Sequence, residues 1–439
     1  MRAATDAIPE QVTIIDLSHD GRGVARCDGK TLFVDGGLTG ETVEILRIRR
    51  RRHHDEGRVV NVLDAAADRV APVCAHFGVC GGCTLQHLSA DGQLEAKQKV
   101  LLENLERIGK VCPGSVFEPL SGPDSAYRRR ARLGVRYVQK KGRVLVGFRE
   151  RAKSFVADLD ACPVLAKPAG DLIQPLAELI GSLTIRRRLA QVEVCIADNR
   201  CAFVLRVLDP PSDADLEQMR AFELAHDIDL YLQPKGPDSI RPLSESARDL
   251  HYRLPEFDLD FRFLPTDFIQ VNAELNRKMV SRAMALLAPA PGQRILDLFC
   301  GLGNFSLPIA RLGAQVVGVE GDAALVRRAR ENARSNGLDS LAEFHVANLF
   351  EDCTGLGWLD QAADSVFLDP PRAGAQEILP AVARTGARRI VYVSCHPATL
   401  ARDAGTLVNE LGFDLRGAGV MDMFPHTAHV ESIALFERS

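Results

Sequence analysis

Residues 294–305 read Arg-Ile-Leu-Asp-Leu-Phe-Cys-Gly-Leu-Gly-Asn-Phe, and this stretch decides the fold of the C-terminal part of the chain. The apolar run Arg294–Cys300 predicts a buried strand, and glycines at 301 and 303 follow it before a helical segment. Glycines at such a turn let the backbone approach a ligand closely. The stretch therefore predicts a ligand-binding loop at the carboxyl end of a strand.

Strands and helical segments alternate regularly around this loop. The predicted strands are Arg294–Cys300, Gln315–Glu320, Ala342–Ala347, Ser365–Asp369 and Arg389–Cys395, followed by a β pair that includes Glu431–Phe436. This alternation is typical of an α/β fold with a parallel, doubly wound, Rossmann-like sheet. We assign residues 266–439 to this domain and expect its ligand at the carboxyl ends of the strands.

Polar residues follow the predicted strands where a nucleoside would lie. Glu320 can accept both ribose hydroxyls, Asn348 can contact adenine, and Asp369 opens the sequence Asp-Pro-Pro-Arg. The loop lacks the spacing Gly-x-Gly-x-x-Gly, which favours S-adenosylmethionine over NAD. Taken singly, each residue could be a strand-end cap or a turn former. Arg372 follows the prolines where amino-group methyltransferases have an aromatic residue, and this argues against an exocyclic nitrogen as methyl acceptor.

Cys395 ends the last parallel strand, and Glu431 begins the final one. A thiol, a methyl-donor pocket and a carboxylate are the groups needed to methylate carbon 5 of a pyrimidine. The thiolate adds to carbon 6, carbon 5 accepts the methyl group, and a base removes the carbon-5 proton. We expect the strand end, a helix N-terminus and a cationic partner to lower the pKa of Cys395. The alternative is a cysteine that serves only as a small buried hydrophobe.

A second group of cysteines has the spacing of metal ligands. Cys74, Cys80 and Cys83 lie close together, and Cys162 precedes Pro163 further along the chain. Four thiolates suit zinc or an iron–sulfur cluster, and a trio with one distant Cys-Pro is commoner for [4Fe–4S]. Glycines at 78, 81 and 82 would let the chain wrap closely. The other cysteines, apart from Cys395, are expected to be structural.

The N-terminal region, residues 1–66, predicts a small β-barrel. Five β-rich runs lie between Gln11 and Asp64, separated by glycine turns. A basic cluster near one loop favours an RNA-binding OB-like barrel, although a solvated run of charges would look the same. Its members are Arg47, Arg49, Arg50, Arg51 and Arg52.

A central region, residues 67–265, is expected to mix strands and helices. Its segment 91–126 could pack on the catalytic domain, and Asp91–Ile108 predicts a helix stopped by Gly109. From Tyr127 to Arg151 there are ten Lys or Arg residues and one acid, with aromatics among them. Such a segment can bind phosphates and stack unpaired bases, so a flipped uridine is expected; a charged strand face is the alternative.

Composition limits the remaining possibilities. The net charge is −4, so any RNA surface must come from local clustering. The first residues have no apolar core typical of a secretory signal, and no run approaches the roughly 20 apolar residues of a membrane span. Eleven cysteines in such a chain indicate reduced thiols, metal ligands or catalysis. We expect a cytoplasmic protein.

Together these motifs resemble the S-adenosylmethionine-dependent RNA 5-methyluridine methyltransferases over nearly the whole chain. The resemblance is closest to the branch that methylates uracil 1939 of bacterial 23S rRNA. It implies an N-terminal TRAM domain, 23S rRNA as partner, and a [4Fe–4S] cluster held by Cys74, Cys80, Cys83 and Cys162. It implies Cys395 as nucleophile and Glu431 as base. The cofactor contacts that it implies are Gln270, Phe299, Asn304, Glu320, Asn348 and Asp369. His396 stands where the family often has Asn, and we expect no loss of activity from it.

Other interpretations remain open at this point. The tRNA enzymes of the family generally lack both TRAM and the cluster, and another rRNA branch lacks TRAM, so the choice of 23S rRNA uracil 1939 depends on domain content. A non-catalytic RNA-binding ribosome-assembly factor is the alternative of a different class. For the cluster, a structural role is preferred to a redox role. We expect a monomer without DNA or membrane partners.

Overall fold

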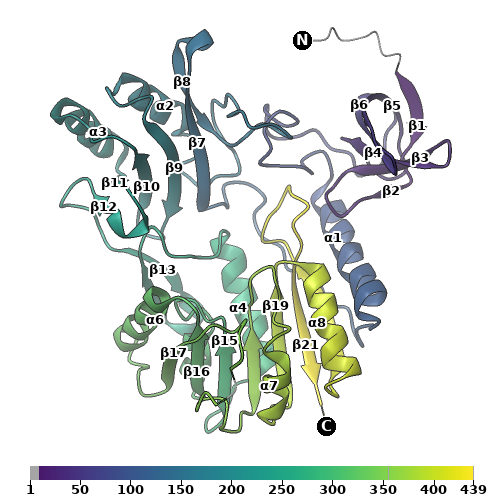
Figure 1. Cartoon of the computed structure of the whole chain (residues 1–439), viewed down its shortest axis with the longest axis vertical. Helices are drawn as coiled ribbons and strands as arrows, with labels where there is room; N and C mark the ends of the chain where they lie inside the picture. Colours follow the sequence, from purple (N-terminus) through teal and green to yellow (C-terminus); the bar gives the residue numbers. More distant parts are fainter. Residues whose placement is uncertain (1–8, 354, 439) are drawn as a thin grey trace.

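The computed structural model describes residues 9–353 and 355–438, which form three domains in sequence (Figure 1). A β-barrel, in purple, lies beside helix α1, a teal central domain lies opposite it, and the green and yellow C-terminal domain lies below both. Residues 1–8, where the sequence predicts no secretory signal, lie outside the described residues. Within the described ranges, no helix is long and apolar enough to cross a membrane.

The barrel contains six strands where the sequence predicts five. The first predicted run divides after Ile14: the Ile14 N–H still donates to the Glu41 carbonyl, next to β5, whereas the Ile15 N–H donates to the Val24 carbonyl of β3, both at 2.8 Å. The strands follow the order β1-β5-β6-β4-β3-β2 around a core that includes the fully buried Leu32 and Ile45. Their bounds are Glu10–Thr13 (β1), Asp16–Leu17 (β2), Gly23–Cys27 (β3), Lys30–Asp35 (β4), Thr42–Arg50 (β5) and His54–Asp64 (β6).

Helix α1, Ala90–Asn104, connects the barrel to the C-terminal domain. The Ser89 hydroxyl caps it by accepting from the Gly92 N–H at 3.1 Å. A π-helical turn, Leu105–Gly109, extends it by one turn beyond Asn104. The residue that ends it in the left-handed conformation is Lys110, not the predicted Gly109. Gly109 lies instead against helix α8, Pro397–Asn409, so closely that a Cβ would be 2.4 Å from the Ala401 carbonyl oxygen.

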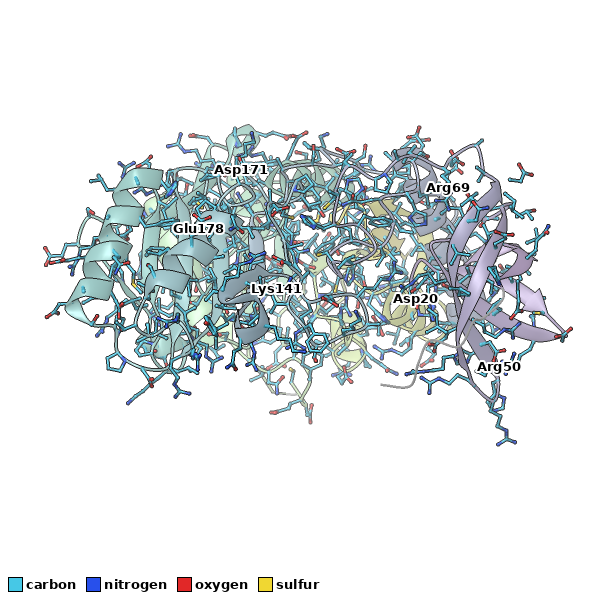
Figure 2. The ribbon with its side chains drawn as sticks, turned by 90° about the horizontal axis from the view of Figure 1, so that it is seen from above. Asp20, Arg50, Arg69, Lys141, Asp171 and Glu178 are labelled. Carbon is cyan, nitrogen blue, oxygen red and sulfur yellow. The ribbon has the colours of Figure 1, made fainter. Side chains whose placement is uncertain are left out.

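The central domain is a six-stranded sheet, β12-β11-β10-β9-β7-β8, with two helices. Most of its core is apolar side chains between the sheet and α2. Figure 2, a view from above, shows the labelled Glu178 of α2 toward one end of the molecule and the labelled Arg50 of the barrel toward the other. The bounds are Arg130–Val138 (β7), Arg143–Gly147 (β8), Ile173–Ser182 (α2), Leu189–Ile196 (β9), Cys201–Val207 (β10), Asp213–His226 (α3), Asp229–Leu232 (β11) and Arg241–Pro242 (β12), with 3₁₀ turns at Gln139–Lys141 and Pro237–Ser239.

A hairpin of β13, Leu250–Leu254, and β14, Leu259–Phe263, joins the central and C-terminal domains, with a 3₁₀ turn at Pro255–Phe257. Its apolar residues share one core with the C-terminal domain. The backbone N–H of Arg262 donates to the Asn332 side chain at 2.9 Å. The hairpin therefore forms a lateral support for the C-terminal sheet.

The C-terminal domain has the predicted α/β fold. Its seven strands follow the order β17-β16-β15-β18-β19-β21-β20; β15 to β19 run parallel, and β21 is antiparallel to both its neighbours. The chain order reverses between β15 and β18, which is the switch point where ligands bind in such sheets. Side chains of successive β15 residues, Ile295 and Leu296, enter different cores on the two faces.

The bounds agree closely with the predicted strands. They are Ala273–Leu287 (α4), Arg294–Leu298 (β15), Ser306–Arg311 (α5), Gln315–Glu320 (β16), Ala323–Ser335 (α6), Ala342–Val346 (β17), Ser365–Leu368 (β18), Leu379–Arg384 (α7), Arg389–Ser394 (β19), Pro397–Asn409 (α8), Asp414–Met421 (β20) and Glu431–Glu437 (β21).

Candidate active site

One cavity of about 530 Å³ lies at the carboxyl ends of β15, β16, β18 and β19. This volume is in the range of small-molecule sites. All eight residues predicted for catalysis and cofactor binding line it: Gln270, Phe299, Asn304, Glu320, Asn348, Asp369, Cys395 and Glu431. Residues up to 161 positions apart in the sequence thus meet in a single site.

The loop after β15 is shaped for a ligand. Phe299, Gly301 and Gly303 all have positive φ, of 66°, 56° and 94°. A phenylalanine in this region is strained, and such strain is concentrated at functional sites. The Gly301 N–H donates to Glu320 Oε2 at 3.1 Å, and the Asp322 N–H donates to Oε1 at the same distance. Both Glu320 oxygens are thereby oriented, and each keeps a lone pair for a hydroxyl donor.

Asn304 and Asn348 are held in different ways. Asn304 exchanges side-chain hydrogen bonds with Asn276 at 3.0 and 3.1 Å and accepts one from the Tyr252 hydroxyl at 2.9 Å. Asn348 folds onto its own loop, accepting from the Phe350 N–H at 3.2 Å and donating to Glu351 at 2.7 Å. Asn304 is therefore preorganised, whereas Asn348 behaves here as a turn former.

Acidic groups below and beside the cavity keep their protons more readily than ordinary carboxyls. Burial raises the pKa of Asp297 and that of Asp369 each to about 7, and the neighbouring Glu320 charge adds to both shifts. Asp297 is fully buried, and its Oδ1 has no hydrogen-bond partner among residues 9–353 and 355–438. A cationic ligand in the cavity would favour the charged form of these acids.

The proposed nucleophile and base face each other. In the antiparallel pair of β19 and β21, Ser394 lies opposite Ser432, so the next position along places Cys395 opposite Glu431. Side chains at directly opposed positions are neighbours on the same face of a sheet. Burial raises the pKa of Glu431 to about 8, and the Asp369 charge contributes.

The predicted lowering of the Cys395 pKa is wrong for the ligand-free protein. Burial and the nearby Glu431 and Asp369 carboxylates raise the pKa of the thiol to about 11. The predicted cationic partner exists, because Arg372 acts in the opposite direction, but it is outweighed. The thiol is therefore protonated until charge or solvation at the site changes.

Arg372 and His429 are site residues that the sequence reasoning did not select. Arg372 Nη2 and His429 Nδ1 lie 2.9 Å apart, and both side chains line the cavity beside Cys395. The available signal was their position: Arg372 ends Asp-Pro-Pro-Arg, and His429 precedes Glu431 by two residues. Phe268 at the same cavity is also 66% exposed, unusual for a large apolar ring.

A second and larger hollow, of about 1210 Å³, meets the first at Cys395. It lies between the barrel, α1 and the C-terminal domain, and Arg372, Cys395 and His429 line both hollows. Figure 2 shows Asp20, another lining residue, on the side of the barrel that faces the C-terminal domain. The thiol thus lies where the small-molecule cavity meets a groove of more than twice its volume.

The four cysteines predicted as cluster ligands line one small cavity. Burial raises the pKa of Cys80, Cys83 and Cys162, and each of these thiols is also influenced by the Cys74 charge. The Gly82 N–H points to the Cys80 sulfur at 3.4 Å. No group of three or more His, Cys, Asp or Glu side chains in the described ranges is close enough to hold a single metal ion. The four thiols nevertheless gather at one cavity, as the ligands of a shared metal centre would.

Not all of the predicted RNA-contacting residues are accessible. Arg129 is buried, pairs with Asp198 at 3.0 Å and stacks on Tyr252, so its role is structural. Tyr127 is buried too, with its hydroxyl on the Pro425 carbonyl at 3.0 Å.

In the barrel, Arg47 pairs with Glu10 and Asp55, whereas Arg49 to Arg52 are exposed. The exposed arginines of both segments, including Arg132 and Arg149, remain candidates for contacts with phosphates.

The family model described as tRNA (Uracil-5-)-methyltransferase matches residues 89–439, and the TRAM domain model matches residues 10–51. The 23S rRNA (uracil(1939)-C(5))-methyltransferase RlmD of Xanthomonas oryzae pv. oryzae is 52% identical over 99% of this chain and 98% of that protein. The protein of the same name from Azoarcus sp. is 53% identical over 97% and 99%.

A solved structure has the same architecture. It is the Pyrococcus abyssi tRNA (uracil-54, C5)-methyltransferase in complex with S-adenosyl-L-homocysteine, with a TM-score of 0.74 and 26% identity over 97% of this chain and 100% of that one. Because that protein acts on tRNA and is matched along its full length, domain content alone does not separate rRNA from tRNA substrates. With a family model that covers most of its length and two relatives above 50% identity, the chain belongs to the tRNA (uracil-5-)-methyltransferase family.

Proposed function

We propose that this protein transfers a methyl group from S-adenosylmethionine to carbon 5 of uracil 1939 in 23S rRNA. The observation that carries the chemistry is Cys395 opposite Glu431, at the junction of a nucleoside-sized cavity and a wide groove. The choice of 23S rRNA is supported by the RlmD relatives at 52% and 53% identity. A tRNA substrate is the second candidate, favoured by the likeness to the Pyrococcus abyssi enzyme.

The methyl donor would occupy the cavity. Glu320 is oriented for the ribose hydroxyls, and Asn304 is fixed by Asn276 and Tyr252. Phe299, Asn348 and Gln270 supply further walls, and Asp369 completes the side next to Cys395. S-adenosylmethionine supplies an electrophilic methyl group on a positively charged sulfur.

Cys395 and Glu431, on the groove side of the cavity, carry out the reaction steps on the uracil ring. Cys395 loses its proton to solvent in the groove, and its sulfur forms a bond to carbon 6 of uracil, making carbon 5 nucleophilic. After carbon 5 has gained the methyl group, Glu431 accepts the proton still attached to it. The electrons of that C–H bond restore the double bond between carbons 5 and 6, and the Cys395 sulfur leaves as thiolate.

The groove is the proposed path of the RNA. A base attacked at carbon 6 has to leave its stack, so the uridine would be flipped toward Cys395. The exposed arginines Arg49 to Arg52 on the barrel and Arg132 and Arg149 on the central domain can neutralise phosphates on either side. Because a single chain carries the whole site, we expect a monomer, and a ribosomal RNA substrate would put it in the cytoplasm.

We also propose that Cys74, Cys80, Cys83 and Cys162 hold a [4Fe–4S] cluster. Support comes from their shared cavity and from the Gly82 N–H at the Cys80 sulfur. Such a cluster would tie the linker after the barrel to the loop before α2, and its role would be structural.

The function is tested with RNA fragments that carry 5-fluorouridine at position 1939. Fluorine cannot be removed by a base, so the protein, S-adenosylmethionine and this RNA should give a covalent complex in a denaturing gel. Cys395→Ala should give none, and a matched fragment with 5-fluorouridine at a neighbouring uridine should give little. Equal trapping on tRNA at position 54 would transfer the proposal to tRNA. RNA binding without any adduct or methyl transfer would instead support a non-catalytic ribosome-assembly factor.

A further inference from the structure

The segment between β20 and β21, residues 422–430, is named here the catalytic loop. It brings His429 to Arg372 and leads directly into Glu431. In Figure 1 it is part of the yellow segment that rises from β21 between α1 and the central domain. The placement of the proposed base therefore depends on how this loop is held.

One side of the catalytic loop is attached to α1. Lys97 Nζ lies 2.5 Å from Asp422 Oδ1 and donates to the Phe424 carbonyl at 3.1 Å, in a buried environment. The Gln93 side chain accepts from the His426 N–H at 2.7 Å. These contacts fix the start and the middle of the loop.

The other side is attached to the cysteine loop, residues 74–88. The backbone N–H groups of Thr84 and Leu85 both donate to the His426 carbonyl, at 2.8 and 2.9 Å. The Thr84 hydroxyl oxygen accepts from the Ala428 N–H at 3.1 Å. Ala428 directly precedes His429, so this last bond is the contact closest to the active site.

The turn at His426 needs such support. His426 has φ of +67°, a conformation that costs energy for any residue other than glycine and persists only when its surroundings impose it. His426 is also buried, and its backbone N–H and carbonyl are bonded to Gln93, Thr84 and Leu85. Loss of one attachment would let the strained turn relax and shift residues 428–430, which lead into Glu431 at the start of β21.

We propose that Thr84 is a positioning residue that sets the place of His429 and Glu431 for removal of the carbon-5 proton. The inference rests on the proposed function, because it needs Glu431 to be the base. Thr84 directly follows Cys83, so the thiolate ligands of the proposed cluster and the catalytic loop share one short piece of backbone. The cysteine loop would then act on the reaction through this hydrogen bond and not through electron transfer.

The test compares Thr84→Val with Thr84→Ser. Valine keeps the shape of threonine but cannot accept the Ala428 N–H, whereas serine keeps the acceptor. One lost hydrogen bond is expected to lower kcat by about 3- to 10-fold in Thr84→Val. KM for RNA and for S-adenosylmethionine should stay unchanged, and Thr84→Ser should restore kcat.

Two further measurements separate positioning from general damage. With RNA carrying deuterium at uridine carbon 5, Thr84→Val should show a larger isotope effect on the release of methylated RNA than wild type, because removal of that hydrogen is the slowed step. Hydrogen exchange of the 424–430 peptide should become faster in Thr84→Val and normal in Thr84→Ser. If valine disturbs folding, Thr84→Ala provides the same loss of acceptor without added bulk.

Three results would overturn the proposal: an unchanged kcat and isotope effect in Thr84→Val and Thr84→Ala, a loss that serine does not restore, or a loss that follows the iron content of the protein. Failure of the proposed function itself is distinguishable, because wild-type protein would then form no adduct with 5-fluorouridine RNA. In that case no Thr84 variant could be compared.

Discussion

Cys395, the residue after β19, lies opposite Glu431 of β21, and the charge of Glu431 helps to raise the pKa of the thiol to about 11. Burial raises the pKa of Glu431 itself to about 8. Two anions at adjacent positions, one buried and one half-buried, are unfavourable, so the pair holds at least one proton at neutral pH in the ligand-free protein. The two groups can therefore act in turn, with the sulfur bonded to carbon when the carboxylate is charged.

Glu431→Gln should trap the reaction after methyl transfer. Glutamine cannot accept the carbon-5 proton, so the adduct cannot collapse and turnover should fall by about 10²–10⁴-fold. A denaturing gel with ordinary uridine RNA and labelled S-adenosylmethionine should show a labelled protein–RNA complex. Cys395→Ala is the control, with neither complex nor product. Free methylated RNA formed by Glu431→Gln at the wild-type rate would remove Glu431 from the mechanism.

Affinity for the methyl donor should depend on pH. Asp369 and Glu431 have pKa values raised to about 7 and about 8, so both are largely neutral in acid and become charged as pH rises. A sulfonium binds better to charged acids, so its affinity should increase by about 10-fold or more from about pH 6 to about pH 9. S-adenosylhomocysteine, with a neutral sulfur, should show a much weaker dependence. Calorimetry in buffers of different ionisation enthalpy would detect the protons released; equal pH dependence for the two ligands would contradict the expectation.

Asp369→Asn should stabilise the ligand-free protein in alkaline solution while impairing methylation. The folded-state pKa of Asp369 is raised from 3.8 to about 7, so its contribution to stability is present below the unfolded pKa and is lost as pH rises through about 7. Asparagine avoids that loss. The Tm difference between variant and wild type should therefore grow by about 2–6 °C from about pH 5 to about pH 8. The exposed Asp339→Asn is the matched control, for which the difference should stay constant.

The positions and ends of the strands of the C-terminal domain could be predicted because its apolar runs are bounded by turns and alternate with helices. Gln315–Glu320 agrees with the structure to the residue, and the polar residues at strand ends met in one cavity because parallel strands share an edge. Gln270 was different. It precedes α4 rather than following a strand, and only family resemblance pointed to it.

Features that depend on tertiary contacts could not be predicted from the sequence. The thiol pKa of Cys395 follows from carboxyls 26 and 36 positions away, which burial brings beside it. Arg129 looked like its neighbours in a basic run, yet Asp198 and Tyr252 enclose it. Gly109 looked like a helix stop because glycine is common there, whereas the contact with Ala401 explains it.

Loss of a proposed cluster ligand should affect iron, stability and loop order together. Cys83→Ser should lower the iron content and the absorbance of the cluster, and it should speed hydrogen exchange in residues 74–88 and 424–430. Cys112→Ser is the control, because Cys112 is exposed and lies outside the cysteine cavity. Full iron content in Cys83→Ser would mean that this cysteine is not a ligand.

The contact between the π-helical turn and α8 predicts that alanine in place of Gly109 lowers the free energy of unfolding, whereas alanine in place of Gly181 raises it. Gly109→Ala would place a Cβ 2.4 Å from the Ala401 carbonyl oxygen, and a Cβ at Gly405 in α8 would be 2.8 Å from the Gly109 carbonyl oxygen. The π-helical turn and α8 would have to separate, which would lower the free energy of unfolding by about 1–3 kcal/mol.

Gly181→Ala in α2 is the control. Its Cβ meets no atom within 4 Å, and it should stabilise the protein by about 0.5–1 kcal/mol, because alanine favours a helix over glycine. Urea unfolding of both variants measures the two effects. Equal stability of Gly109→Ala and Gly181→Ala would mean that α1 does not dock on the catalytic domain as closely as described, and the attachment of the catalytic loop through Lys97 and Gln93 would lose its rigid base.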